Sequence, residues 1–161
     1  MINLIVACDL NRVIGKNGKL PWSIKEDWDY FMEKTSGGSM VMGKTCYYEF
    51  EPYADGRELI VLTHNVSSKF AKAKAANSLK HALALATHSP IWICGGEKLY
   101  QESMPIAARL YITKINHSFE GDVYFPDWEK PFPRMVSCMK LDTGKYNLEF
   151  MVFEKNNQTR S

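Results

Sequence analysis

Continuous apolar runs that alternate with helix-like segments constrain the fold of this chain more than any other feature. Strand-like runs occupy residues 2–8, 40–42, 58–63, 91–94, 109–115, 135–141 and 148–154. Helix-like segments occupy residues 24–35, 45–50, 79–87 and 97–103. Strands interleaved with helices predict an α/β fold, and uninterrupted apolar runs indicate a sheet that is covered on both faces. We therefore expect a central, mostly parallel twisted sheet flanked by about four helices, with an antiparallel end where the last strands follow one another without helices.

Length and charge restrict the class of protein. A chain of 161 residues suggests one domain that buries about 70% of its unfolded surface. No linker, repeat or low-complexity segment divides the chain, so we expect a single domain over 1–161 with a flexible polar tail at 156–161. The net charge of +2 is too weak to indicate nucleic-acid binding. Without a signal peptide, lipidation motif or membrane-spanning run, the default expectation is a cytoplasmic monomer with no membrane partner.

The cysteine and histidine residues do not form the patterns of a metal site or a disulfide framework. Cys8, Cys46, Cys94 and Cys138 are far apart, and three of them lie in apolar or helix-opening segments. This distribution favours reduced, mostly buried thiols. The histidines also lack metal-ligand spacing. We expect no bound metal.

Asp27 is the most informative single residue, because its neighbours predict an apolar environment. Ser23 and Glu26 fit a capping box, which predicts a helix start at this point. Residues at helical spacing mark one buried stripe of that helix: Ile24, Trp28, Phe31 and Thr35. Asp27 falls on the same stripe, where a carboxylate loses hydration and needs a partner. That partner is a ligand, a buried hydroxyl or a water molecule, unless Asp27 lies at the edge of the stripe.

Residues 38–45 fit the P-loop pattern G-x-x-x-x-G-K-[ST], but the match is misleading. The four middle residues, Ser-Met-Val-Met, indicate a strand rather than a phosphate cradle, and no apolar run ends in the Asp of a second magnesium site. What remains is a strand-to-helix turn at Gly43-Lys44-Thr45 that could hold an anion. Gly95-Gly96 forms a second such turn. Two turns at the carboxyl ends of parallel strands indicate a ligand crevice, although no G-x-G-x-x-G of an ordinary Rossmann site is present.

Short motifs along the chain occur in the order and spacing of one family. They are Ile5-Val6-Ala7, Val13-Ile14-Gly15, Leu20-Pro21-Trp22, Asp27 with Phe31, Met42-Gly43-Lys44-Thr45, Gly56-Arg57, Ile93-Cys94-Gly95-Gly96 with Tyr100, Thr113, and Glu120-Gly121-Asp122 with Phe125-Pro126. Covering nearly the whole chain, they make it resemble the bacterial, chromosomal-type dihydrofolate reductases. The resemblance implies an NADPH-dependent oxidoreductase of one-carbon metabolism and an antifolate target. It would reduce 7,8-dihydrofolate to 5,6,7,8-tetrahydrofolate by hydride transfer to pterin C6 with protonation of N5.

The resemblance also implies how the substrate is held. Asp27 would accept hydrogen bonds from the pterin's 2-amino group and ring N–H, and Thr113 would hydrogen-bond Asp27. A water molecule would deliver the proton to N5. Arg57 would bind the α-carboxylate of the glutamate tail, a task suited to a guanidinium group. The implied substrate-binding residues are Ile5, Val6, Asp27, Trp28, Phe31, Phe50, Ala54, Arg57, Cys94, Tyr100 and Thr113.

The loop at 9–23 would close over the nicotinamide and exclude bulk water. It contributes Leu20 and Trp22, which complete the implied catalytic set with Asp27 and Thr113. The turn at 121–122 would support this loop.

On the cofactor side, Ala7 and Ile14 would offer backbone groups to the nicotinamide carboxamide, and the two glycine turns would hold the pyrophosphate. Lys44, His64 and Lys98 would lie near the adenosine ribose, which favours NADPH because basic groups suit a 2′-phosphate. The implied cofactor-binding residues are Ala7, Ile14, Gly15, Gly18, Leu20, Gly43, Lys44, Thr45, Cys46, Leu62, Thr63, His64, Gly95, Gly96, Glu97, Lys98, Leu99 and Tyr100.

Several positions depart from the common pattern of the family without removing a catalytic group. Cys46 replaces a frequent Thr, Cys94 a usual Ile and Ala54 a usual Leu, while Trp28 is bulkier than a common Leu or Phe. Lysines at 44 and 98 replace frequent arginines, which loses bidentate phosphate recognition.

Two other classes of protein are compatible with parts of the pattern. A pyrimidine reductase of riboflavin synthesis shares the fold, but its substrate lacks the glutamate tail that Arg57 would bind. A folate- or nucleotide-binding protein without turnover would have no need of Asp27 or the nicotinamide loop.

Overall fold

The computed structural model describes residues 1–65 and 67–155, so the tail predicted at 156–161 lies outside the described residues. Its main sheet comprises the strands β1 (Ile2–Cys8), β3 (Ser39–Gly43), β4 (Glu58–Leu62), β5 (Lys74–Ala76), β6 (Ile91–Ile93), β7 (Arg109–Ile115), β9 (Arg134–Asp142) and β10 (Asn147–Glu154). The helices are α1 (Lys25–Thr35), α2 (Lys44–Phe50), α3 (Leu79–Leu85) and α4 (Glu97–Ser103), with a 3₁₀ turn η1 at Glu51–Tyr53.

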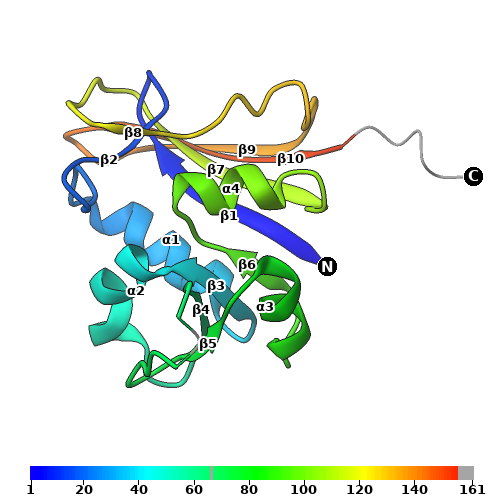
Figure 1. Ribbon diagram of the computed structural model, residues 1–161. Helices are drawn as coiled ribbons and strands as arrows, with labels where there is room; N and C mark the ends of the chain where they lie inside the picture. Colours follow the sequence, from blue (N-terminus) through cyan, green and yellow to red (C-terminus); the bar gives the residue numbers. More distant parts are fainter. Residues whose placement is uncertain (66, 156–161) are drawn as a thin grey trace, which may run out of the picture.

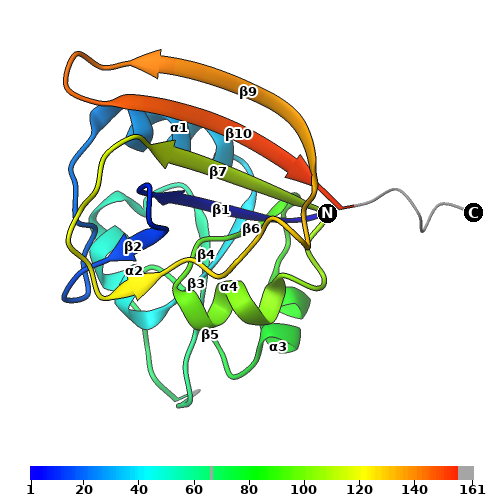
Figure 2. The same cartoon turned by 90° about the horizontal axis from the view of Figure 1, so that it is seen from above.

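The 8-stranded sheet has the order β5-β4-β3-β6-β1-β7-β10-β9, which can be followed in Figures 1 and 2. All neighbours from β5 to β7 run parallel, whereas β10 is antiparallel to both β7 and β9. The predicted α/β fold, with a mostly parallel sheet and an antiparallel end, is therefore confirmed.

Alternate side chains of the central strands enter different cores on the two faces of the sheet. In β3, Val41 joins the large cluster that includes residues of α3 and α4, while Met40 and Met42 join a second cluster with Tyr47 and Phe50. All four strand residues from Ser39 to Met42 are buried. The segment that mimics a P-loop is thus a central strand, as the sequence indicates, because a run buried on both faces is apolar throughout.

Helix α1 begins differently from the prediction. Its N-cap is Ile24, which makes no side-chain cap hydrogen bond, so the capping box predicted for Ser23 and Glu26 is wrong. Ile24 is buried and packs in a cluster with Trp22, while Ser23 is exposed. Burial of these two apolar side chains, rather than a polar cap, fixes where the chain enters the helix.

Three short strands were not predicted from the sequence. The strands β2 (Val13–Gly15) and β8 (Val123–Tyr124) pair in a separate two-stranded sheet, and β5 adds a parallel edge to β4. Each has two or three residues, too few to show a periodic pattern. The helix predicted at 79–87 ends at Leu85.

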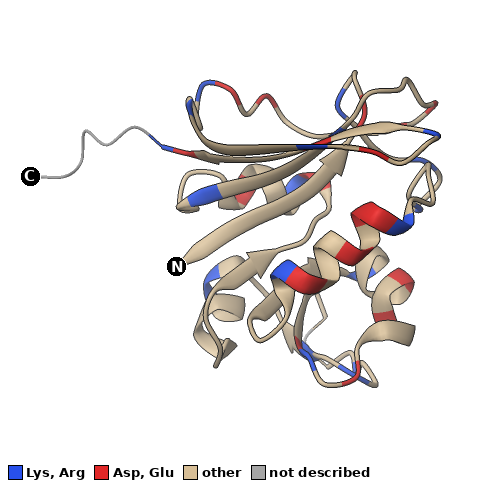
Figure 3. Cartoon of the chain, turned by 180° about the vertical axis from the view of Figure 1, so that it is seen from behind, with Lys and Arg blue, Asp and Glu red and all other residues tan. Residues whose placement is uncertain are grey.

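The surface is mixed in charge. Figure 3 shows basic residues at the two ends of α1 with acidic residues between them, and residues of both signs scattered over the loops. Within the described residues, none of the helices is long and apolar enough to span a membrane.

Candidate active site

A cavity of about 740 Å³ opens at the carboxyl ends of the central parallel strands. Its walls come from the end of β1, the loop after it, one side of α1, and the two strand-to-helix turns β3–α2 and β6–α4. This position is the one that parallel α/β sheets use for ligands, because the chain turns there leave a crevice.

Asp27 enters the cavity from the first turn of α1. Burial raises the pKa of its carboxyl to about 6, and a hydrogen bond from the Thr113 side chain acts in the opposite direction. Thr113 is itself buried on β7 and lines the same cavity. A carboxyl group poised near neutral pH in an apolar wall is a typical feature of a functional site.

Aromatic rings form the wall beside Asp27. The ring centroids of Trp28, Phe31 and Phe50 lie 5.8 Å from one another, with Phe31 and Phe50 edge to face at 76°. Across the pocket, the Tyr100 hydroxyl donates to the Ile5 carbonyl oxygen at 2.7 Å. These contacts leave a rigid, flat-sided slot suited to a planar ring.

The two glycine turns lie against each other. The Gly43 amide donates to the Gly95 carbonyl oxygen at 2.8 Å. Gly95 has φ +114°, and a Cβ there would meet the Tyr100 ring at 3.1 Å, so a larger residue would strain the turn. Gly43 and Gly96 are the N-caps of α2 and α4 and provide no side-chain cap. Their chain segments can therefore approach a ligand closely.

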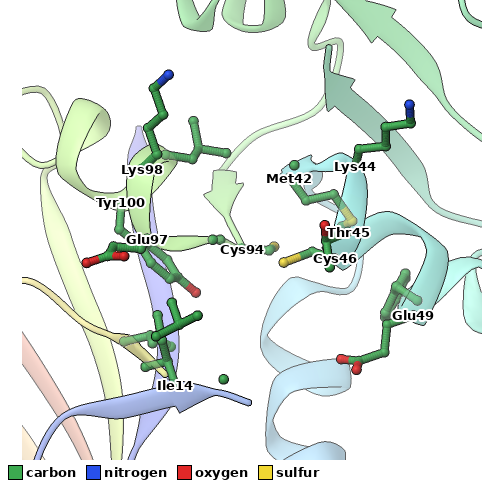
Figure 4. A pocket seen from close by; sticks show the side chains of 18 of the residues that line it. Ile14, Met42, Lys44, Thr45, Cys46, Glu49, Cys94, Glu97, Lys98 and Tyr100 are labelled. Atoms are coloured by element: carbon green, nitrogen blue, oxygen red, sulfur yellow. The ribbon is translucent and has the colours of Figure 1, made fainter. Parts of the chain in front are cut away.

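Figure 4 shows the two walls that these turns build. Lys98, Glu97 and Tyr100 project from the α4 side, and the residues of α2 project from the other. Lys44 and Lys98 extend toward the same end of the pocket from opposite walls.

The loop between β1 and α1 covers another side of the cavity and is held at two places. On one side, the Asp122 amide donates to Gly15 O at 3.0 Å, and the Asn17 amide donates to Asp122 Oδ2 at 3.2 Å. On the other side, the Leu20 amide donates to Glu49 Oε2 of α2 at 3.3 Å.

Gly121 packs directly on the same loop. A Cβ added to Gly121 would lie 2.2 Å from Val13 Cγ1 and 2.7 Å from Gly15 O. The turn at Gly121 thus contacts the base of the loop at a distance that no other residue allows.

Nearly all predicted site residues are brought together around this cavity. From the substrate set it includes Ile5, Val6, Asp27, Trp28, Phe31, Phe50, Cys94, Tyr100 and Thr113, and from the cofactor set every residue from Ala7 to Tyr100. Three predicted residues lie outside its lining: Trp22, Ala54 and Arg57.

These three residues lie behind the lining residues and do not face the cavity. Ala54 is buried beneath it, and Trp22 is buried with its ring 5.2 Å from that of Phe119. The Arg57 guanidinium donates to Thr35 Oγ1 at 2.7 Å and to the Met32 carbonyl oxygen at 2.8 Å. Arg57 therefore braces the end of α1, and burial lowers its pKa.

Other lining residues were missed by the sequence analysis. They are Lys19, Tyr30, Met42, Glu49, Asn77, Ser78, Glu102 and Val123. Tyr30 and Glu49 lie on helices already assigned to the site and could have been found from helical spacing. Asn77 and Ser78 follow β5, so they could not be placed without that strand.

A cavity of this kind, with Asp27 among aromatic rings and two glycine turns at its rim, is typical of nucleotide-dependent α/β enzymes. The family model described as "Dihydrofolate reductase" matches residues 1–155. The chain belongs to the dihydrofolate reductase family.

Individual relatives agree with this assignment. A dihydrofolate reductase of Bacillus subtilis (strain 168) is 36% identical over 100% of this chain and 98% of its own length. One from Staphylococcus haemolyticus is 32% identical over 96% of this chain and 95% of its own length. The solved structure of a dihydrofolate reductase from Enterococcus faecalis, complexed with NADP(H) and RAB-propyl, superposes with a TM-score of 0.87 at 30% identity. It covers 98% of this chain and 97% of its own.

Proposed function

We propose that this pocket reduces 7,8-dihydrofolate to 5,6,7,8-tetrahydrofolate with NADPH. The observation that carries the proposal is Asp27, a single carboxyl group set in an aromatic slot with Thr113 beside it. Membership of the dihydrofolate reductase family supports the same reaction, and the chain is accordingly an NADPH-dependent oxidoreductase.

Asp27 orients the pterin and raises its affinity for a proton. Its carboxylate accepts hydrogen bonds from the 2-amino group and a ring N–H, which is the pairing an apolar slot otherwise lacks. Because its pKa is about 6, the group changes charge near neutral pH and can follow protonation of the substrate. The rings of Trp28, Phe31 and Phe50 hold the pterin and benzoyl planes and exclude water.

The residues present fit NADPH. Gly95 leaves room at the rim where a Cβ would press on the Tyr100 ring at 3.1 Å, and the Gly43 turn lies against it through a backbone hydrogen bond. Lys44 and Lys98 supply positive charge toward one end of the pocket. When bound, the cofactor supplies the hydride. The chain's own part is to bind it along these turns and to cover the site with the loop that carries Leu20.

The alternatives of a pyrimidine reductase and of a non-catalytic binder are less well supported. The family match, the carboxyl of Asp27 and a loop anchored from two sides all favour turnover of a folate. We also propose that the chain acts in the cytoplasm as a monomer, without nucleic-acid or membrane partners, and that antifolates bind in the same aromatic slot. The small net charge of +2 supports the absence of nucleic acid.

A single assay separates these functions. Purified protein is mixed with NADPH and 7,8-dihydrofolate, and the loss of NADPH absorbance is followed. We expect turnover with dihydrofolate and none with a ribosylaminopyrimidine that represents the riboflavin route. Binding of both ligands without oxidation of NADPH would instead identify a non-catalytic binder. Sedimentation of the same sample across a concentration series tests the monomer.

A further inference from the structure

Cys46 and Cys94 place two thiols in the same part of the cavity. Cys46 lies in the first turn of α2, and Cys94 directly follows β6. Both side chains pack against one hydrophobic cluster. Figure 4 shows the two sulfur atoms directed toward one another between the α2 wall and the β6 wall.

The backbone explains why the two segments meet. The Cys94 amide donates to the Val41 carbonyl oxygen at 2.9 Å, and the Gly43 amide donates to the Gly95 carbonyl oxygen at 2.8 Å. Cys94 is thereby fixed beside the end of β3, just before α2 begins. In a helix the Cα–Cβ bond tilts toward the N-terminus, so the Cys46 side chain leans back over Gly43 toward that junction.

The two thiols are neutral near pH 7. Burial raises the pKa of Cys46 to about 11. Burial also raises the pKa of Cys94, and the negative form of nearby Cys46 adds to that effect. The Cys94 thiol donates weakly to the Trp92 carbonyl oxygen at 3.5 Å. Neutral thiols react slowly with reagents that need a thiolate, and both cysteines are free in the structure.

We propose that Cys46 and Cys94 form a dithiol site for trivalent arsenic, and that its occupation blocks the cavity. Phenylarsine oxide condenses with both thiols: two As–S bonds form, the As–O bond is broken, and both thiol protons leave with the oxygen as water. Arsenic stays trivalent and no electrons are transferred. Soft sulfur ligands suit such a thiophilic centre, and closure of a chelate by the second thiol supplies the affinity.

The first measurement counts thiols and does not depend on the proposed reaction. Denatured samples are titrated for free thiols before and after treatment with equimolar phenylarsine oxide, and the intact mass is recorded. We expect a 1:1 adduct and loss of two of the 4 cysteine thiols, restored by a vicinal dithiol but not by an equal amount of monothiol. Loss of no thiols, or an adduct that a monothiol removes, overturns the proposal.

Variants locate the site. Cys46→Thr and Cys94→Ile should each raise the phenylarsine oxide concentration for half-occupancy roughly 100-fold, because one thiol cannot chelate. Cys138→Ser is the matched control: Cys138 is exposed on β9, and its removal should leave the adduct unchanged. Bound NADPH together with an antifolate should protect the wild-type protein from forming the phenylarsine oxide adduct. An adduct formed equally well by Cys46→Thr and Cys94→Ile, or lost in Cys138→Ser, would assign the chemistry to other thiols.

Discussion

Asp27 and Arg57 are both half-buried charged residues near the same aromatic slot, yet their surroundings differ. Asp27 faces the cavity, where Thr113 also lies and opposes the rise in the Asp27 pKa that burial causes. Arg57 uses its guanidinium to hold the end of α1 through Thr35 and Met32. The carboxyl therefore remains available to a ligand, whereas the guanidinium combines a structural task with any role in binding.

Replacing Asp27 with Asn should abolish most turnover at neutral pH, because the charge that polarises the pterin is lost. Activity should return in part at low pH, where the substrate itself is protonated. Single-turnover hydride transfer measured across a pH series tests this. A variant as fast as wild type at neutral pH would show that Asp27 is not required.

The same substitution has a calculable effect on stability. The pKa of Asp27 rises from 3.8 to about 6 on folding, so the folded state keeps this proton to higher pH than the unfolded chain. The stability of the wild type should fall as pH rises from 3.8 to about 6. Above this range, Asp27→Asn should be more stable than the wild type by about 1 to 3 kcal/mol. Urea unfolding at pH 4 and pH 7 measures the difference, which should be smaller at pH 4.

Arg57→Ala should weaken the binding of dihydrofolate by about 2–5 kcal/mol if the guanidinium binds the glutamate tail. A diaminopyrimidine without that tail should bind nearly as before. Because Arg57 also braces α1, the variant should lose about 1–3 kcal/mol of stability. Comparing both ligands by calorimetry separates the roles, since equal weakening of the two would leave Arg57 with the structural task alone.

At the scale of elements, the two strand-to-helix turns place Lys44 and Lys98 on opposite walls of one cavity end. Changing both lysines to Ala should weaken the binding of NADPH by about tenfold or more and the binding of NADH much less, because the 2′-phosphate is the group that distinguishes the two cofactors. Fluorescence titration with each cofactor is the measurement. An equal loss for both would place the 2′-phosphate elsewhere.

The loop between β1 and α1 depends on its contact with the turn at Gly121. Gly121→Ala adds a Cβ 2.2 Å from Val13 Cγ1, so β2 or the turn must move, at a cost of about 1–3 kcal/mol. Hydride transfer should slow because the displaced loop no longer covers the cavity correctly. Gly144→Ala is the control, since its Cβ meets nothing within 4 Å although φ is +90°. It should reduce stability without slowing hydride transfer.

Periodicity and turn chemistry were sufficient to predict the long elements and the two glycine turns, whereas most residues of the cavity wall were predicted only from the resemblance to the dihydrofolate reductases. Asp27 could be recognised because an acid interrupts an apolar stripe. Ser23 could not be judged correctly, because burial of Trp22 and Ile24 decides the helix start and is a tertiary effect. Arg57 shows a similar limit: its hydrogen bonds to Thr35 and Met32 join segments whose contact no local pattern reveals.

At the scale of the whole molecule, Glu58 joins segments far apart in the sequence. Its carboxylate accepts hydrogen bonds from Ser39 of β3, from Lys74 of β5 at 3.0 Å, and from the Thr87 amide at 2.8 Å. Burial alone would raise its pKa, but these hydrogen bonds hold the pKa well below its usual range.

Glu58→Gln should therefore lower the stability of the whole domain by about 2 kcal/mol at pH 7. A depressed pKa means that the carboxylate stabilises the fold above its unfolded value of 4.5, and this contribution is lost as pH falls below it. The difference in stability between wild type and variant should therefore become smaller at acidic pH. Thermal unfolding from pH 7 to pH 3 gives the result, and a gap that widened in acid would contradict this account.

The place of β1 in the sheet has a consequence for synthesis on the ribosome. β1 precedes every other strand of the described residues, but its neighbours are β6 and β7, which begin at Ile91 and Arg109. At a translation rate of about 5–20 residues per second, β1 waits several seconds with both edges unpaired. Pairing across such a long separation is slow. The pocket therefore cannot be complete before β7, which carries Thr113, has left the exit tunnel, and no fragment that ends before β7 can assemble it.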